Sequence, residues 1–150
     1  MSRFAAELSE KLVKKLQPET FVLLNTVDAE TGGPTSSVTS WIYAVDPSTL
    51  RLTIDHRSRL VNNLKVNPLV TVTVFEDGQV FAIGGRAKVR QDPLNEVPFD
   101  MCCFDIHVEA VRNALFHGIE LAAPPQYVKT DNVCAAEKLD GQVFAAMRKA

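Results

Sequence analysis

The chain has 150 residues, 23% of them charged, and a net charge of −2 at pH 7, which fits one soluble domain over residues 1–150 and argues against a general nucleic-acid binder. No apolar run approaches the roughly 20 residues of a membrane helix, and the N-terminus lacks the apolar core of a signal peptide, so we expect neither. Three cysteines without a C-x-x-C pair argue against a disulfide framework and favour a reducing cytoplasm.

The first predicted element is an amphipathic helix near the N-terminus. Apolar residues recur there at every fourth position: Phe4, Leu8, Leu12 and Leu16. This spacing predicts a helix that ends before Pro18. Stretches rich in β-branched and aromatic residues then predict three strands, over 21–27, 35–45 and 50–55. The last two are joined by only a few turn residues, which predicts that they are antiparallel.

The rest of the chain predicts an inserted helix, three more strands and a closing helix. Ser58 is a typical N-cap and Pro68 ends the helical pattern, which predicts a short helix between them. The further strands are predicted over 69–75, 80–89 and 104–111. Asp77-Gly78 is a strong hairpin signal between the first two of these. Residues 118–132 are predicted to be a loop, and apolar spacing by four predicts a helix from 135 to 147.

Six antiparallel strands that lie close in sequence must hide their edges, and closure into a small barrel does so. We therefore predict a mainly β fold, a six-stranded antiparallel barrel with helices at its periphery. Periodicity alone does not identify what such a barrel binds.

The densest polar cluster is the segment 55–59, Asp-His-Arg-Ser-Arg, where a strand ends and a helix begins. A helix N-terminus presents free N–H groups and a positive dipole end, so Arg57, Ser58 and Arg59 make a candidate anion site. The alternative is that both arginines are solvated charges and that Ser58 only caps the helix.

A second polar cluster, residues 36–41, places four hydroxyl side chains in one strand beside the only tryptophan, Trp41. A polar ligand lying along the strand explains this composition. An exposed sheet face, where serine and threonine are well tolerated, explains it equally well.

Other site chemistries find little support in the sequence. The histidines at 56, 107 and 117 have no metal-binding spacing, so we expect no metal centre. No G-x-S-x-G motif indicates a nucleophilic serine. The cysteines have no basic neighbour within two residues to lower their pKa, which favours packing roles. We therefore name no catalytic residue.

Three further motifs accompany these clusters. They are Ile54-Asp55-x-x-Ser58-Arg59, Asn63-Leu64-x-x-Asn67-Pro68 and Gln79-Val80-x-x-Ile83-Gly84. In this order and spacing, the chain resembles the pyridoxamine 5′-phosphate oxidase-like family of FMN-binding split β-barrels, including its short general-stress-protein members. The resemblance covers residues 5–92.

The resemblance implies a six-stranded antiparallel Greek-key split β-barrel that forms a homodimer, with FMN at the subunit interface. In such proteins the segments aligned with 38–43 and 53–55 line the flavin. The Ser58-Arg59 pair holds the phosphate, and Gln79 approaches the ring. With Arg57 added from the polar cluster, the predicted cofactor-binding residues are Val38, Thr39, Ser40, Trp41, Ile54, Asp55, Arg57, Ser58, Arg59 and Gln79.

The chain departs from the classical oxidases at positions that are cationic in those enzymes. Val38, Tyr43 and Leu60 replace an arginine and two lysines. A charge-assisted hydrogen bond contributes about 1.5–3 kcal/mol, so the loss of two weakens FMN binding by several kcal/mol unless other groups substitute. The C-terminus also lacks the Arg-Leu-x-Pro tail that helps to hold the substrate, which argues against pyridoxamine phosphate oxidase activity.

Three functions remain open at this point. The first is an FMN-dependent oxidoreductase acting on an unknown small substrate. The second is a flavin-binding carrier, sensor or stress protein without turnover. The third is a barrel that binds another planar ligand, such as haem or a deazaflavin. In each case we expect a homodimer formed through the faces of the segments 35–45 and 80–89.

Overall fold

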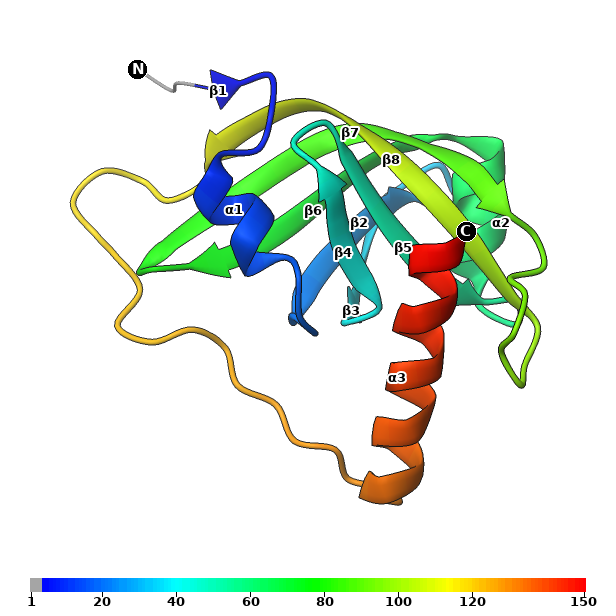
Figure 1. The fold of residues 1–150 in the computed structure, drawn as a ribbon. Coiled ribbons are helices and arrows are strands. Elements are labelled where there is room, and N and C mark those ends of the chain that lie inside the picture. The colour runs from blue at the N-terminus through cyan, green and yellow to red at the C-terminus, as the bar shows by residue number, and fades with distance from the viewer. Residues whose placement is uncertain (1–3) are drawn as a thin grey trace.

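The computed structural model describes residues 4–150, so residues 1–3 of the predicted single domain lie outside the described residues. The strands are β1 (Phe4–Ala5), β2 (Val22–Val27), β3 (Pro34–Thr39), β4 (Ile42–Asp46), β5 (Thr49–Asp55), β6 (Leu69–Glu76), β7 (Gln79–Gln91) and β8 (Met101–Asn113). The helices are α1 (Glu10–Lys15), α2 (Arg59–Val66) and α3 (Val133–Lys149). Figure 1 shows the helices at the periphery of a strongly curved antiparallel sheet.

The strands follow the order β3-β2-β6-β7-β8-β5-β4, and the short β1 adds to β8. The first and last strands of this order, β3 and β4, are consecutive in the chain and are separated only by Ser40 and Trp41. The carbonyl of Trp41 accepts a hydrogen bond from the Thr53 N–H at 3.0 Å. The two ends of the sheet therefore meet at this link, which confirms the predicted mainly β split-barrel architecture.

The structure differs from the prediction in the number of strands, which is eight rather than six. The predicted strand 35–45 is broken at Ser40 and Trp41, because the chain passes there from one end of the sheet to the other. The predicted N-terminal helix was also too long. It begins at Glu10, where Ser9 is the N-cap, and Phe4 and Ala5 form β1 instead. Leu8 is nevertheless buried, as are Leu12 and Leu16. The apolar spacing therefore indicated which residues are buried, but not a continuous helix.

Two apolar clusters stabilise the fold. The larger one fills the barrel and includes Leu24, Ile42, Val72, Phe104 and Ile106. The smaller one lies between the sheet and α3 and contains Tyr43, Leu94, Met101, Cys103, Val143, Ala146 and Met147. Arg51 ties this second cluster together. Its guanidinium donates to Asp105 at 2.7 Å and to the Met147 carbonyl at 3.0 Å.

The long strand β7 bends at a bulge between Gly84 and Gly85. A Cβ atom at Gly85 would clash with the carbonyl oxygen of His107 on β8. Only glycine allows this close approach of two backbones, and the bulge lets the strand follow the curvature of the barrel.

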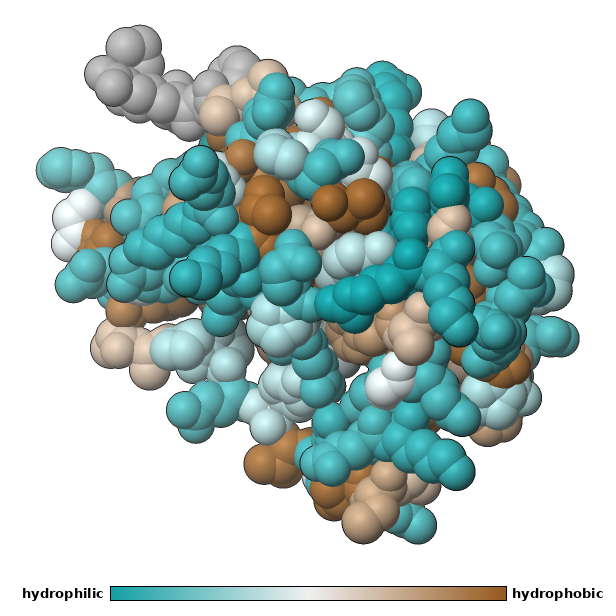
Figure 2. Space-filling model, viewed as in Figure 1, coloured by the Kyte–Doolittle hydropathy of each residue, from teal (hydrophilic) through white to brown (hydrophobic). Residues whose placement is uncertain are grey.

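Hydrophilic side chains cover most of the face shown in Figure 2, with separate apolar patches near α1 and near the lower end of α3. Within residues 4–150, no helix combines the length and apolar composition needed to cross a membrane.

Candidate functional site

A pocket of about 310 Å³ lies where β3 passes into β4, against the end of β5 and the start of α2. Of the predicted cofactor-binding residues, it brings together Val38, Thr39, Ser40, Trp41, Ile54, Asp55 and Ser58. Leu24, Thr53 and Leu60 complete its lining. Residues 38–41, residues 53–60 and Leu24 of β2 therefore form one concave site.

The β5 wall of this pocket holds an unpaired polar group. Thr53 is 1% exposed, and its hydroxyl has no hydrogen-bond partner among the described residues. A buried polar group without a partner is costly, and such groups occur where a site receives a ligand or a water molecule. Thr53 pairs with Cys103 across β5 and β8, so its side chain lies beside the Cys103 thiol, on the face of β5 opposite to that of Ile54.

Side chains of the hydroxyl-rich strand β3 alternate between an exposed face and a half-buried face. Ser36 and Val38 are exposed, whereas Ser37 and Thr39 are half-buried. The Ser36 hydroxyl donates to Asn25 Oδ1 at 2.6 Å, so it is occupied within the sheet. Thr39, but not Ser36, lines the pocket. The pocket is lined by Val38 and Thr39, at the end of the strand, rather than by the hydroxyls at its start.

Ser58 is the N-cap of α2, and its hydroxyl accepts a hydrogen bond from the Leu60 N–H at 3.2 Å. The Ser58 N–H in turn donates to the Asp55 carbonyl at 2.9 Å. These bonds fix the turn between β5 and α2, and they place the N-terminal end of the helix beside the pocket. That end is suited to an anion.

The two arginines at this end are paired with carboxylates of the same chain. Arg57 Nη2 lies 2.8 Å from Asp55 Oδ2, and its side chain is 87% exposed. This hydrogen bond lowers the pKa of Asp55 to about 2. Arg59 Nη2 lies 2.6 Å from Asp28 Oδ2, and its side chain is 67% exposed. An incoming anion must compete with both carboxylates, although exposed pairs of this kind are weak.

Of the predicted residues, Arg57, Arg59 and Gln79 do not line the pocket. Gln79 is separated from the others. It lies at the start of β7, opposite Glu76 in the hairpin, and it is exposed. It does not line the pocket of this chain. Tyr43, one of the three non-cationic replacements, is buried in the second apolar cluster under the Arg148 guanidinium, 5.0 Å from its ring centroid.

Leu60 has a double environment. It lines the pocket, and it also packs, partly buried, against the main core. The position that carries lysine in the classical oxidases therefore lies at the boundary between core and site.

The structure also groups His56, Asp92 and Cys102, whose potential ligand atoms lie within 4.8 Å of one another. This group could not be predicted from the sequence, since its members come from three segments. Both oxygens of Asp92 are engaged, one by the His56 imidazole and the other by Lys65 Nζ at 2.9 Å. Burial raises the pKa of the Cys102 thiol to about 11. These contacts describe a hydrogen-bonded anchor of the β5–α2 turn.

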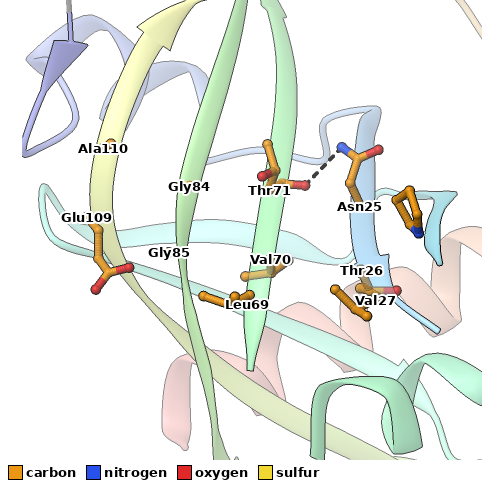
Figure 3. A pocket seen from close by; sticks show the side chains of 11 residues that line it. Asn25, Thr26, Val27, Leu69, Val70, Thr71, Gly84, Gly85, Glu109 and Ala110 are labelled. Atoms are coloured by element: carbon orange, nitrogen blue, oxygen red, sulfur yellow. Dashed lines mark hydrogen bonds between the residues drawn. The ribbon is translucent and has the colours of Figure 1, made fainter. Parts of the chain in front are cut away.

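A second pocket, of about 400 Å³, lies over β2, β6, β7 and β8 (Figure 3). One row of paired residues crosses these four strands: Asn25, Thr71, Gly84 and Ala110. Asn25 Nδ2 donates to the Thr71 carbonyl at 3.0 Å. The small residues of the row leave this surface hollow. The sequence does not indicate the row, because it exists only in the register of the sheet.

Comparison with known proteins agrees with this architecture. The sequence profile of a family described as pyridoxamine 5′-phosphate oxidase matches residues 8–114. No curated protein matches the chain.

Three solved structures illustrate the similarity in fold. A Lactobacillus delbrueckii protein with the provisional name pyridoxamine 5′-phosphate oxidase is 22% identical, with a TM-score of 0.60, over 71% of this chain and 94% of its own. General stress protein 26 of Bacillus anthracis is 17% identical, with a TM-score of 0.56, over 68% and 89% of the two chains. An F420 reductase is 19% identical, with a TM-score of 0.57, over 69% and 98%. At these identities the structures establish a shared fold.

Proposed function

The chain belongs to the pyridoxamine 5′-phosphate oxidase family, and from this premise we propose that it binds FMN in the pocket between β3, β5 and α2 and acts as an oxidoreductase on a small substrate. The observation that carries the proposal is the convergence of residues 38–41, residues 53–60 and Leu24 on one pocket beside a capped helix start.

Different residues in and beside the pocket would bind different parts of the cofactor. Ser58, Arg59 and the first N–H groups of α2 would hold the phosphate, with Arg57 as a further cation. The β3–β4 link and Ile54 would flank the ring. Bound FMN would supply hydride chemistry, while the chain binds and orients it.

We further propose that residues 1–150 form one FMN-binding domain of a cytoplasmic homodimer. Val38 is 55% exposed beside the pocket, and the hollow surface of Figure 3 crosses four strands. A second subunit would cover apolar strand surface, and it would bring its own Gln79 toward the site. The described cysteines are all free, which suits a reducing compartment.

A second candidate, a flavin-binding protein without turnover, is favoured by the ionisable content of the pocket. Asp55 is the only titratable residue of its lining, and the hydrogen bond from Arg57 keeps the pKa of Asp55 at about 2. A carboxyl with this pKa is ionised at neutral pH and cannot act as a general acid.

Titration with FMN and riboflavin, followed by flavin fluorescence, tests the proposal. We expect saturable binding of FMN at one site per chain, and weaker binding of riboflavin, which lacks the phosphate. Anaerobic reduction by a nicotinamide cofactor, followed by reoxidation, distinguishes the oxidoreductase from the non-catalytic protein. A purified protein that binds neither flavin contradicts both. Light scattering that gives the monomer mass at micromolar concentration contradicts the dimer.

A further inference from the structure

The C-terminal part of the chain, beyond the family match at residues 8–114, returns to the candidate site. Figure 1 shows a long connection that leaves β8, crosses the molecule and enters α3, which stands beside the sheet. The Trp41 indole Nε1–H donates a hydrogen bond to Asp140 Oδ1 on α3 at 2.8 Å. Trp41 also lines the pocket and packs against the second apolar cluster. It is therefore the residue through which α3 and the pocket meet.

Asp140 is itself held on its other side. Lys129 Nζ, in the long connection, lies 2.7 Å from Asp140 Oδ2 and 3.2 Å from Glu19 Oε2. The three side chains of this network are mostly shielded from solvent. The nearby Tyr127 ring lies against Phe21, with centroids 5.8 Å apart. The carboxylate that receives the indole is thus fixed by contacts to the connection and, through Lys129, to the segment before β2.

The backbone of Trp41 transmits this position to the pocket wall. Its carbonyl accepts from the Thr53 N–H at 3.0 Å, and its N–H donates to the Thr39 hydroxyl at 3.3 Å. Thr39 and Thr53 both line the pocket. Thr39, Trp41 and Thr53 form one wall of the pocket. A shift of the indole therefore changes the shape of this wall.

We propose that Asp140 is a positioning residue of the flavin site. It holds the Trp41 indole against α3, so that the Thr39–Trp41 link keeps the shape needed to bind the cofactor. The segment beyond the family match thereby completes the pocket without contacting the ligand. This inference rests on the proposed function for the ligand, whereas the contact between Asp140 and Trp41 can be tested without it.

The experiment uses the full chain and its single tryptophan. Asp140→Ala removes the acceptor, Asp140→Asn keeps an acceptor oxygen, and Asp131→Asn changes an exposed acid just before α3 as a matched control. The readouts are the emission maximum of Trp41, its quenching by acrylamide, the FMN dissociation constant and the melting temperature. Trp41 emission requires no flavin.

We expect Asp140→Ala to shift the emission to longer wavelength, to increase acrylamide quenching and to weaken FMN about three- to tenfold, the range of one hydrogen bond. Asp140→Asn should restore most of the affinity even if the loss of its pairing with Lys129 lowers the melting temperature. That separation of affinity from stability is the mark of a positioning role. Should Asp140→Ala fail to fold, Lys129→Gln, which releases Asp140 on its far side, carries the test and should shift emission and affinity in the same direction.

Unchanged emission and unchanged FMN affinity in a folded Asp140→Ala protein overturn the proposal. A loss of affinity that Asp140→Asn shares in full, in step with its melting temperature, also overturns it, because a general loss of stability then explains the result. If the parent binds no FMN, the proposed function fails and Asp140 has no flavin site to position. In that case the emission shift still shows whether Asp140 holds Trp41.

Discussion

The wall and the rim of the candidate site are built differently. The wall, formed by Thr53, Ile54 and the β3–β4 link, is fixed by strand pairing on both sides of β5. The rim, formed by Arg57, Ser58 and Arg59, is fixed by the turn hydrogen bonds and the Ser58 cap, whereas both guanidinium groups are exposed and paired with carboxylates. The wall therefore determines shape, whereas the rim supplies charge that must be redirected when an anion arrives. The following predictions test this difference.

The largest effect is expected at Arg59. Arg59→Ala should weaken FMN by roughly ten- to hundredfold, because a charge-assisted hydrogen bond contributes on the order of 1.5–3 kcal/mol. Riboflavin, without a phosphate, should bind parent and variant alike. Arg90→Ala removes another exposed arginine, which donates to the Ala150 carbonyl away from the pocket, and it should leave both affinities unchanged. If Arg59→Ala binds FMN with the same affinity as the parent, Arg59 pairs only with Asp28 and does not contact the phosphate.

Leu60 tests the boundary between wall and rim. Leu60→Lys should tighten FMN by about 1–2 kcal/mol, because one charge-assisted contact is added in a partly exposed place. The aliphatic part of lysine can cover the same apolar surface, so the melting temperature should fall only slightly. Val66→Lys, at the exposed far end of α2, controls for added charge. A large drop in melting temperature without tighter binding would assign Leu60 to the core.

Thr53 tests the wall by itself. Thr53→Val removes a buried hydroxyl that has no partner in the described residues, so the free energy of unfolding should rise by about 1 kcal/mol. Thr26→Val is the matched contrast, because the Thr26 hydroxyl accepts from Asn63 Nδ2 at 3.3 Å and its loss should destabilise. Urea denaturation of the two variants measures the difference, and the same sign for both would contradict it.

The smallest effect is expected from the rim pair of Asp55 and Arg57. The pKa of Asp55 is lowered from 3.8 to about 2, chiefly by the hydrogen bond from Arg57. A lowered pKa stabilises the fold above the unfolded value and loses that contribution as the pH falls from about 4 to 2. The stability difference between the parent and Asp55→Asn should therefore shrink over this range. It should be small throughout, since Arg57 is exposed.

Local features of the fold could be predicted from the sequence. Ser58 caps α2 as expected, because capping involves only neighbouring N–H groups. The Asp77-Gly78 turn forms as expected, with positive φ angles of 52° and 75°, since this dipeptide tolerates that conformation. Seven of the ten residues predicted from the polar clusters and the family resemblance line one pocket in the structure.

Features that depend on distant partners could not be predicted. The break at Ser40 and Trp41 follows from closure of the sheet against Thr53, which no local pattern records. Arg59 is paired with Asp28 and Trp41 with Asp140, across 31 and 99 positions of the chain. An arginine or a tryptophan in a sequence does not reveal which carboxylate it will meet, because that is set by the register of the whole sheet.

The link between β3 and β4 also affects how the chain folds. Four hairpins, β2–β3, β4–β5, β6–β7 and β7–β8, join strands that are consecutive in the described chain and can form early. The pairs β2–β6 and β5–β8 join strands separated by long stretches of chain. The loop-closure entropy of these pairs must be overcome before the barrel can close. Folding should therefore have a rate typical of sheets rich in non-local contacts, in the range of milliseconds to seconds. Most of the pocket lining lies within residues 38–60, on the β4–β5 hairpin and its two flanks, so this part of the site should form before the distant strands pair.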